Sequence, residues 1–200
     1  MMESQPTYCR ITDDLCSSNG QKIHNTQKLP AQQWFRFLFD HLELEYPKFH
    51  KMDGLSKLGV LGVEFLKTVE SLPTETDEIA VVFVNKHSSL DADLSHQEQI
   101  EKGSASPAMF VYTLPNIVLG EIAIRNKWYG EQQFFIKNEW PHELIHEYIV
   151  TIFELNKANR IIIGYVDYFQ EKTDGKWVIL TQDQFNNEKI REEINTFFDK

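Results

Sequence analysis

Hydrophobic positions along the chain follow two alternating periods, one typical of strands and one typical of helices. Residues 78–85 (EIAVVFVN) form a nearly continuous, β-branched run, which predicts a strand covered on both faces. Further strands are predicted at 132–137, 160–169 and 177–181, and helices at 31–44, 54–72, 114–127, 141–157 and 188–198. Buried strands that alternate with helices indicate a layered α/β domain with a largely parallel sheet.

Turn and capping residues predict where several elements end. Residues 7–22 are typical of a short strand pair around Ser17-Ser18-Asn19-Gly20, in which Asn-Gly favours a tight turn. A second turn is expected at Lys172-Thr173-Asp174-Gly175, between two strands. Asp53 is the expected N-cap of the helix at 54–72. That helix has apolar residues around most of its circumference, so we expect it to be buried.

Composition narrows the class of protein. The 200 residues are 42% hydrophobic and include 14 Phe, which suits one well-cored domain over 1–200 and disfavours a disordered chain. A net charge of −10 disfavours nucleic acid and anionic membrane surfaces. Residues 1–7 carry no basic or apolar signal segment, so a cytoplasmic location is expected. Cys9 and Cys16 could form a disulfide, although two free thiols are the favoured interpretation.

Residues 110–136 (FVYTLPNIVLGEIAIRNKWYGEQQFFI) contain a motif that resembles a segment of the β-ketoacyl carrier-protein synthases, the ketosynthases of the thiolase-like superfamily. The similar elements are Leu114-Pro115-Asn116 at a helix start, then Gly120, Ile122-Ala123-Ile124 and Gly130. Two further stretches resemble the family in the same order, Phe49-His50-Lys51-Met52-Asp53 and residues 160–167 (RIIIGYVD). The resemblance covers residues 45–170 and is poor over the first 40 residues.

The resemblance implies the amino-terminal half of a ketosynthase. Its fold would be a three-layer α/β/α thiolase-like half with a mostly parallel central sheet. In the family, the position of Leu114 lines the acyl pocket near the dimer seam. The resemblance therefore makes Leu114, Asn116 and Gly120 candidates for an acyl pocket or a subunit interface.

The nucleophilic cysteine of the family has no counterpart in this sequence. The family places that cysteine between the strand after the glycine turn and the next helix, where helix N–H groups favour a thiolate. Counting from Gly130 leads to Glu139, and no cysteine follows Cys16. The family's two catalytic histidines belong to a second half that these 200 residues do not contain. Glu139 would either imitate the thiolate as a permanent anion or, as we favour, stabilise a helix N-terminus by ~0.3–1 kcal/mol.

A second motif points to different chemistry. His142-Glu143-Leu144-Ile145-His146 is an HExxH sequence on a predicted helix. Histidines four residues apart share a helix face and could bind Zn²⁺, with Glu143 activating water. No third ligand lies in a recognisable motif, and the resemblance explains this helix without a metal. We therefore favour histidines at the solvent edge of a core helix, with no metal and no cofactor.

These observations together predict a ketosynthase-like pseudoenzyme. We expect a non-catalytic subunit or accessory protein in carrier-protein-dependent fatty acid, polyene or polyketide synthesis. The expected partner is a second copy or a complete ketosynthase; an acidic acyl carrier protein is a weaker candidate, because like charges repel. Two alternatives stay open: a zinc-dependent hydrolase at His142, Glu143 and His146, and an acyltransferase half completed in trans by a partner chain.

Overall fold

The computed structural model describes residues 5–199, so the first four residues of the segment searched for a signal lie outside it. The strands are β1 (Thr7–Thr12), β2 (Leu15–Ser18), β3 (Gln21–His24), β4 (Ile79–Asn85), β5 (Gln132–Ile136), β6 (Arg160–Phe169) and β7 (Lys172–Thr181). The helices are α1 (Ala31–His41), the 3-10 helix η1 (Pro47–Lys51), α2 (Gly54–Lys67), α3 (Leu90–Glu101), α4 (Pro107–Val111), α5 (Ile117–Asn126), α6 (His142–Glu154), α7 (Gln182–Asn186) and α8 (Glu188–Asp199). No helix among these residues is long and apolar enough to cross a membrane.

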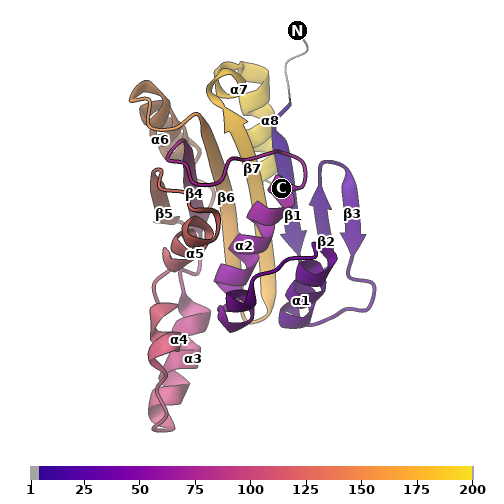
Figure 1. Cartoon of the computed structure of the whole chain (residues 1–200), viewed down its shortest axis with the longest axis vertical. Coiled ribbons are helices and arrows are strands. Elements are labelled where there is room, and N and C mark those ends of the chain that lie inside the picture. The colour runs from indigo at the N-terminus through magenta and orange to yellow at the C-terminus, as the bar shows by residue number, and fades with distance from the viewer. Residues whose placement is uncertain (1–4, 200) are drawn as a thin grey trace.

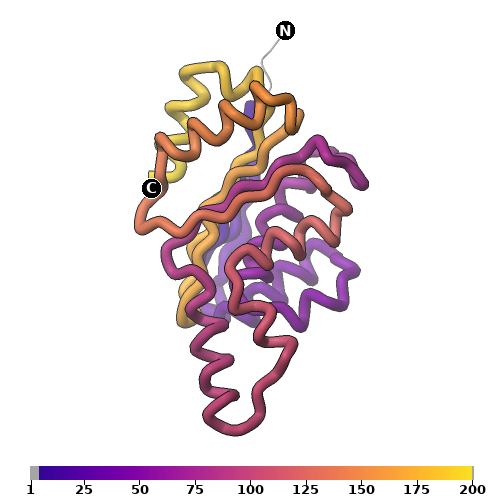
Figure 2. Tube along the Cα trace, turned by 90° about the vertical axis from the view of Figure 1, so that its left-hand side faces the viewer, coloured from indigo at the N-terminus to yellow at the C-terminus, as the bar shows by residue number. Residues whose placement is uncertain are grey.

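The chain forms three layers around one seven-stranded sheet. The strand order is β3-β2-β1-β7-β6-β4-β5. Helices α1, α2 and α5 cover one face, and α6, α7 and α8 cover the other (Figures 1 and 2). Each face has its own hydrophobic core. Helices α3 and α4 extend beyond the sheet as a helical hairpin at one end of the molecule (Figure 2).

Mixed strand directions correct the expectation of a mostly parallel sheet. Only β4–β5 and β4–β6 pair in parallel, whereas the other four pairings are antiparallel. Strands β5, β4 and β6 form the parallel part of the sheet. Their central strand, β4, comes from the apolar run at 78–85 that predicted a strand covered on both faces, and every residue of β4 is buried. Three of the four antiparallel pairings, β1–β2, β2–β3 and β6–β7, join consecutive strands through tight hairpins, which only antiparallel neighbours permit. The fourth joins β1 to β7, which are far apart in the sequence. Strand β1 alternates buried and half-buried residues and β3 is mostly exposed, whereas β4 is buried along its whole length.

Two of the hairpin turns were predicted from the sequence, and one of them differs from the expected position. Asn19 and Gly20, at φ 42° and 86°, connect β2 to β3, and a third strand joins the predicted pair. The turn expected at 172–175 is wrong, because these residues belong to β7. The chain turns instead at Gln170 and Glu171, both with positive φ, so that Phe169 pairs with Lys172.

Helix α2 is the central buried helix, as its sequence predicted. Asp53 caps it by accepting a hydrogen bond from the backbone N–H of Ser56 at 3.0 Å. Twelve of its fourteen residues are buried. Close packing on both neighbours requires glycine: a Cβ at Gly62 would overlap the ring of Trp177 on β7, and one at Gly59 would overlap Val118 on α5. The two glycines therefore allow α2 to approach both the sheet and α5.

The two cysteines are buried free thiols on the adjacent strands β1 and β2. Burial, together with the neighbouring Cys16 thiol, raises the pKa of Cys9 well above its ordinary value. A protonated, inaccessible thiol is a poor nucleophile.

Candidate functional site

Glu139 lies in the loop that joins the carboxyl end of β5 to α6. This is the strand–loop–helix junction at which the resemblance placed the nucleophile. The side chain is exposed and precedes the first residue of α6, His142, by three positions. The helix has no side-chain cap, and the acidic residue in its first turn is Glu143. Glu143, in the first turn of α6, therefore occupies the position from which a carboxylate stabilises a helix N-terminus.

A polar cavity of about 340 Å³ opens beside this junction. It is lined by Glu139, Trp140, His142, Tyr165, Asp174, Lys176, Phe198 and Asp199. Lys176 is only 5% exposed, and its Nζ donates to the carbonyl oxygen of Phe198 at 3.3 Å. Desolvation lowers the pKa of Lys176, although the charge of Asp174 opposes the shift. The ammonium group holds the carboxyl end of α8 on the sheet, where cations are favoured.

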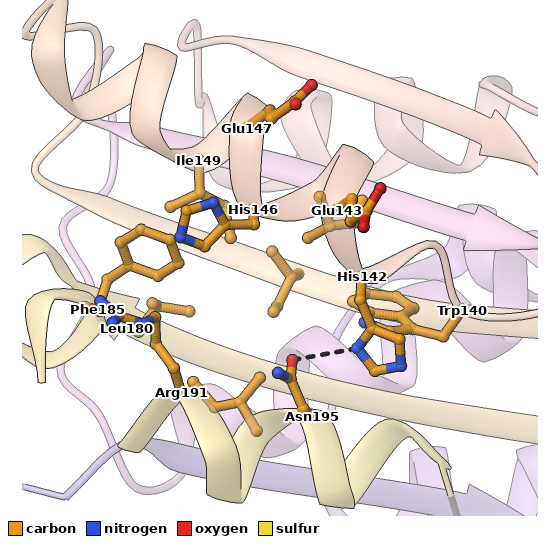
Figure 3. Close-up of a pocket in the computed structure, with 13 residues that line it drawn as sticks. Trp140, His142, Glu143, His146, Glu147, Ile149, Leu180, Phe185, Arg191 and Asn195 are labelled. Atoms are coloured by element: carbon orange, nitrogen blue, oxygen red, sulfur yellow. Dashed lines mark hydrogen bonds between the residues drawn. The ribbon is translucent and has the colours of Figure 1, made fainter. Parts of the chain in front are cut away.

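His142 and His146 make separate contacts and do not converge on a common point (Figure 3). The ring nitrogens of His142 lie 3.1 Å from Asn195 Oδ1 and 2.8 Å from Asp199 Oδ1, which ties α6 to α8. The ring of His146 packs on Phe185, with centroids 5.1 Å apart. Within residues 5–199, no group of three or more His, Cys, Asp or Glu side chains is arranged to hold a metal. A zinc ion would first have to displace both contacts of His142.

Leu114, Asn116 and Gly120 lie on the other side of the sheet. Leu114 is 54% exposed in the turn between α4 and α5, and Asn116 is the N-cap residue of α5. A Cβ at Gly120 would meet open space. Helix α5 packs on α2, on the sheet face opposite α6 (Figures 1 and 2). The structure therefore separates these three residues from Glu139 and the two histidines.

Sequence reasoning missed a histidine–carboxylate pair at the carboxyl ends of β4 and β6. His87 Nδ1 lies 2.6 Å from Asp167 Oδ2, and Asp167 Oδ1 accepts from the backbone N–H groups of Lys86 and His87. The imidazole stacks on Phe169 at 4.8 Å. His87 follows the predicted strand at 78–85 by two residues, and Asp167 lies two residues before the end of the predicted strand at 160–169, so their positions near two strand ends were the available signal.

Comparison with known proteins identifies the fold through structure. No protein-family model matches the amino-acid sequence, and no curated protein is significantly similar to it. The structure resembles the ishigamide ketosynthase/chain length factor, with a TM-score of 0.59, 15% identity, and coverage of 71% of this chain and 47% of that one.

Two further solved structures give the same result. A chain of the ketosynthase ApeO in complex with its chain length factor ApeC from Xenorhabdus doucetiae aligns with a TM-score of 0.57 and 11% identity, over 90% of this chain and 80% of that one. A chain of the type II PKS acyl-carrier protein complex AntDE:AntF, with its ketosynthase bound to the hexaketide, aligns with a TM-score of 0.61 and 9% identity, over 90% and 63%. This chain spans less than half of the first of the three structures. The fold is that of ketosynthase/chain length factor proteins.

Proposed function

We propose that this chain is a non-catalytic, ketosynthase-like subunit that pairs with a complete ketosynthase in carrier-protein-dependent polyketide or polyene synthesis, in the cytoplasm. The observation that carries the proposal is Glu139 in the loop between β5 and α6, the junction at which the sequence resemblance places the nucleophile of the ketosynthases. A carboxylate cannot form the thioester through which a cysteine nucleophile carries an acyl group. Cys9 and Cys16 are buried on strands at the other side of the sheet's centre and do not replace it. Pairing is supported by analogy with ApeO, a ketosynthase in complex with its chain length factor.

The distribution of exposed apolar side chains supports pairing at one side of the molecule. Within residues 5–199, nine of the twelve exposed large hydrophobic residues lie between positions 90 and 136, on α3, α4, α5, β5 and their connections. We call this set the β5-side surface: Leu90, Leu94, Ile100, Phe110, Val111, Leu114, Ile124, Tyr129 and Ile136. These elements lie together at one side of the sheet (Figure 1). Clustered apolar exposure of this kind marks a protein interface.

Strand β5 adds a second feature to the same surface. It is one of the two edge strands of the sheet, its one partner within residues 5–199 is β4, and its residues are half-buried or exposed. An open strand edge presents unpaired backbone N–H and C=O groups that another chain can bind. Leu114, expected at a subunit interface, belongs to this surface. The in-trans alternative would use the same surface, with the partner supplying the cysteine and histidines.

Charge favours a synthase rather than a carrier protein as the direct partner. The chain carries a net charge of −10, so an acidic carrier protein would need a local basic patch. Four cations that could form such a patch are Lys51, Lys57, Arg125 and Lys127. Arg125 is engaged by Glu64, and Lys57 donates to Gln32 at 2.6 Å. Lys127 also pairs with Glu75, so three of the four cations make internal contacts.

Co-expression with the complete ketosynthase of the same host tests the proposal. We expect the two chains to co-purify and to elute as a heterodimer in size exclusion with light scattering. A matched control is the same ketosynthase expressed with an unrelated acidic protein. A clean monomer at micromolar concentration, with no ketosynthase in the pull-down, would contradict the proposal.

A further inference from the structure

A cleft between α6 and α8 lies next to the polar cavity and has a different character. It encloses about 310 Å³ and is lined mainly by apolar side chains from α6, α8, β6, β7 and α7. Its aliphatic lining comprises Ile145, Ile149, Ile163, Leu180 and Ile194. The volume falls at the lower end of the range for small-molecule sites, which are also mostly apolar. The cleft and the polar cavity share only Trp140 and His142.

The two ends of the cleft differ in charge. At one end, Arg191 and His146 both contact the ring of Phe185: the guanidinium carbon lies 5.8 Å from the ring centroid, and the imidazole centroid lies at 5.1 Å. Arg191 Nη1 donates to the carbonyl oxygens of Phe185 and Asn186, which fixes the guanidinium at the cleft wall. Glu143 and Glu147 point away from the interior (Figure 3). Arg191 is the one lysine or arginine in the lining, and it lies at the end formed by Phe185.

The other end is closed by aromatic packing. Trp140 is 8% exposed and stacks on Phe198 with ring centroids 3.7 Å apart. His142 and Asn195 bridge α6 to α8 above this end. Along α6, the lining residues run from position 142 to 149, a length of about 10 Å at the rise of an α-helix. The cleft is thus an elongated apolar slot with a closed aromatic end and a cationic end.

We infer that this cleft binds a small anionic amphiphile, a carboxylate on an unbranched aliphatic chain of octanoate length. The chain lies along the isoleucine walls, and the carboxylate lies at Arg191 and His146. Charge complementarity selects the anion: the guanidinium is permanently positive and presents donors in the planar geometry that carboxylates accept. The site is on the α6–α8 face, away from the β5-side surface, so it does not depend on pairing with a ketosynthase.

Isothermal titration of the whole chain with octanoate tests the inference, with octan-1-ol as the uncharged probe of matched length. We expect saturable binding of octanoate at one site per chain and weaker binding of octanol. Arg191→Met should weaken octanoate at least tenfold, the loss expected for one charge-assisted hydrogen bond, and leave octanol unchanged. Lys189→Met is the matched control, because Lys189 lines a separate surface hollow on α8 and the net charge changes equally.

A blocking variant keeps the test decisive if Arg191→Met disturbs α7. Asn195→Trp should fill the cleft and abolish binding of both probes, whereas Glu192→Trp, at an exposed position of α8 outside the cleft, should bind octanoate normally. The inference is overturned by absence of saturable binding at millimolar octanoate, by equal affinity for octanol, or by binding that survives Asn195→Trp. None of these outcomes changes the expected pairing with a ketosynthase, so the two proposals fail separately.

Discussion

Arg125 on α5 donates two hydrogen bonds to the carboxylate of Glu64 on α2, from Nε at 2.8 Å and from Nη2 at 3.2 Å. Both side chains are largely buried, and Lys67 Nζ adds a third contact at 3.0 Å. Burial alone would raise the pKa of Glu64, but the hydrogen bond from Arg125 and the two positive charges hold the pKa below its ordinary value. The carboxylate therefore links the central helix to the layer that carries the β5-side surface.

Breaking this pair should destabilise the fold strongly. Arg125→Met leaves a buried carboxylate with only Lys67, and we expect a loss of about 3 kcal/mol in the free energy of unfolding. The control is Lys127→Met, which removes an ion pair to Glu75 in which both side chains are more than half exposed, and should cost less than about 1 kcal/mol. Urea unfolding of both variants provides the measurement. Equal losses would show that Glu64 does not need Arg125.

The same pair predicts a dependence on pH. Because the pKa of Glu64 is lower in the folded than in the unfolded chain, its contribution is complete above the ordinary glutamate pKa of about 4.3. The contribution is lost as the pH falls through the lower, folded-state value. Unfolding experiments between neutral pH and acid should therefore show a smaller acid-induced loss for Arg125→Met than for the natural chain.

Alanine substitutions at two glycines, one closely packed and one exposed to open space, provide a second variant with its matched control. Gly62→Ala would push a methyl group into the ring of Trp177, so we expect a loss of about 1–3 kcal/mol from overpacking. Gly120→Ala adds the same methyl group to α5, where space is open, and should stabilise the helix by up to about 1 kcal/mol. Thermal unfolding distinguishes the two. A destabilising Gly120→Ala would be inconsistent with the described packing of α5.

The sequence predicted local features well wherever local chemistry decides them. Asp53 caps α2, the run at 78–85 forms the fully buried β4, and Asn19-Gly20 forms a turn. The turn at 172–175 failed because pairing with both β6 and β1 overrides the turn preference of Asp174 and Gly175. Gln170 and Glu171, which make the real turn, are not residues that favour positive φ. Strand direction was also missed, since it depends on which strands become neighbours.

In the candidate site, too, positions within a local pattern could be predicted, whereas contacts between distant segments could not. Glu139 was assigned by counting along a predicted strand–loop–helix pattern; the structure confirms the strand, the loop and the helix, and the role of Glu139 stays a prediction. His87 and Asp167 were missed because they are 80 residues apart and meet only through the parallel pairing of β4 and β6. Leu114, Asn116 and Gly120 could be assigned to a helix start, but no local signal told which face of the sheet that helix covers.

Metal content is a further prediction. Protein purified without a histidine tag should contain well under one zinc per chain, because His142 is engaged by Asn195 and Asp199. His146→Ala should cost only about 1 kcal/mol, the value of its ring contact with Phe185. Elemental analysis and thermal unfolding are the measurements. Stoichiometric zinc with a chelator-sensitive hydrolase activity would replace the present account with the HExxH alternative.

Self-acylation should be absent. Incubated with malonyl- and acyl-carrier proteins, the chain should show no mass increase by intact mass spectrometry and no condensation product. Glu139 cannot hold an acyl thioester, and burial keeps the Cys9 thiol protonated. Glu139→Cys is the informative variant, since it restores a thiol at the junction. An adduct that turns over on the natural chain would rule out a non-catalytic role.

Pairing with a complete ketosynthase through the β5-side surface is the central claim, and one binding measurement tests it most directly. The affinity of the purified ketosynthase is compared for the natural chain, for Ile124→Asp and for Leu155→Asp. Ile124 and Leu155 are similarly exposed, at 66% and 62%, but Leu155 follows α6 on the opposite face. We predict that Ile124→Asp weakens binding at least tenfold while Leu155→Asp leaves it unchanged. No binding by the natural chain, or equal binding by all three proteins, would contradict the account.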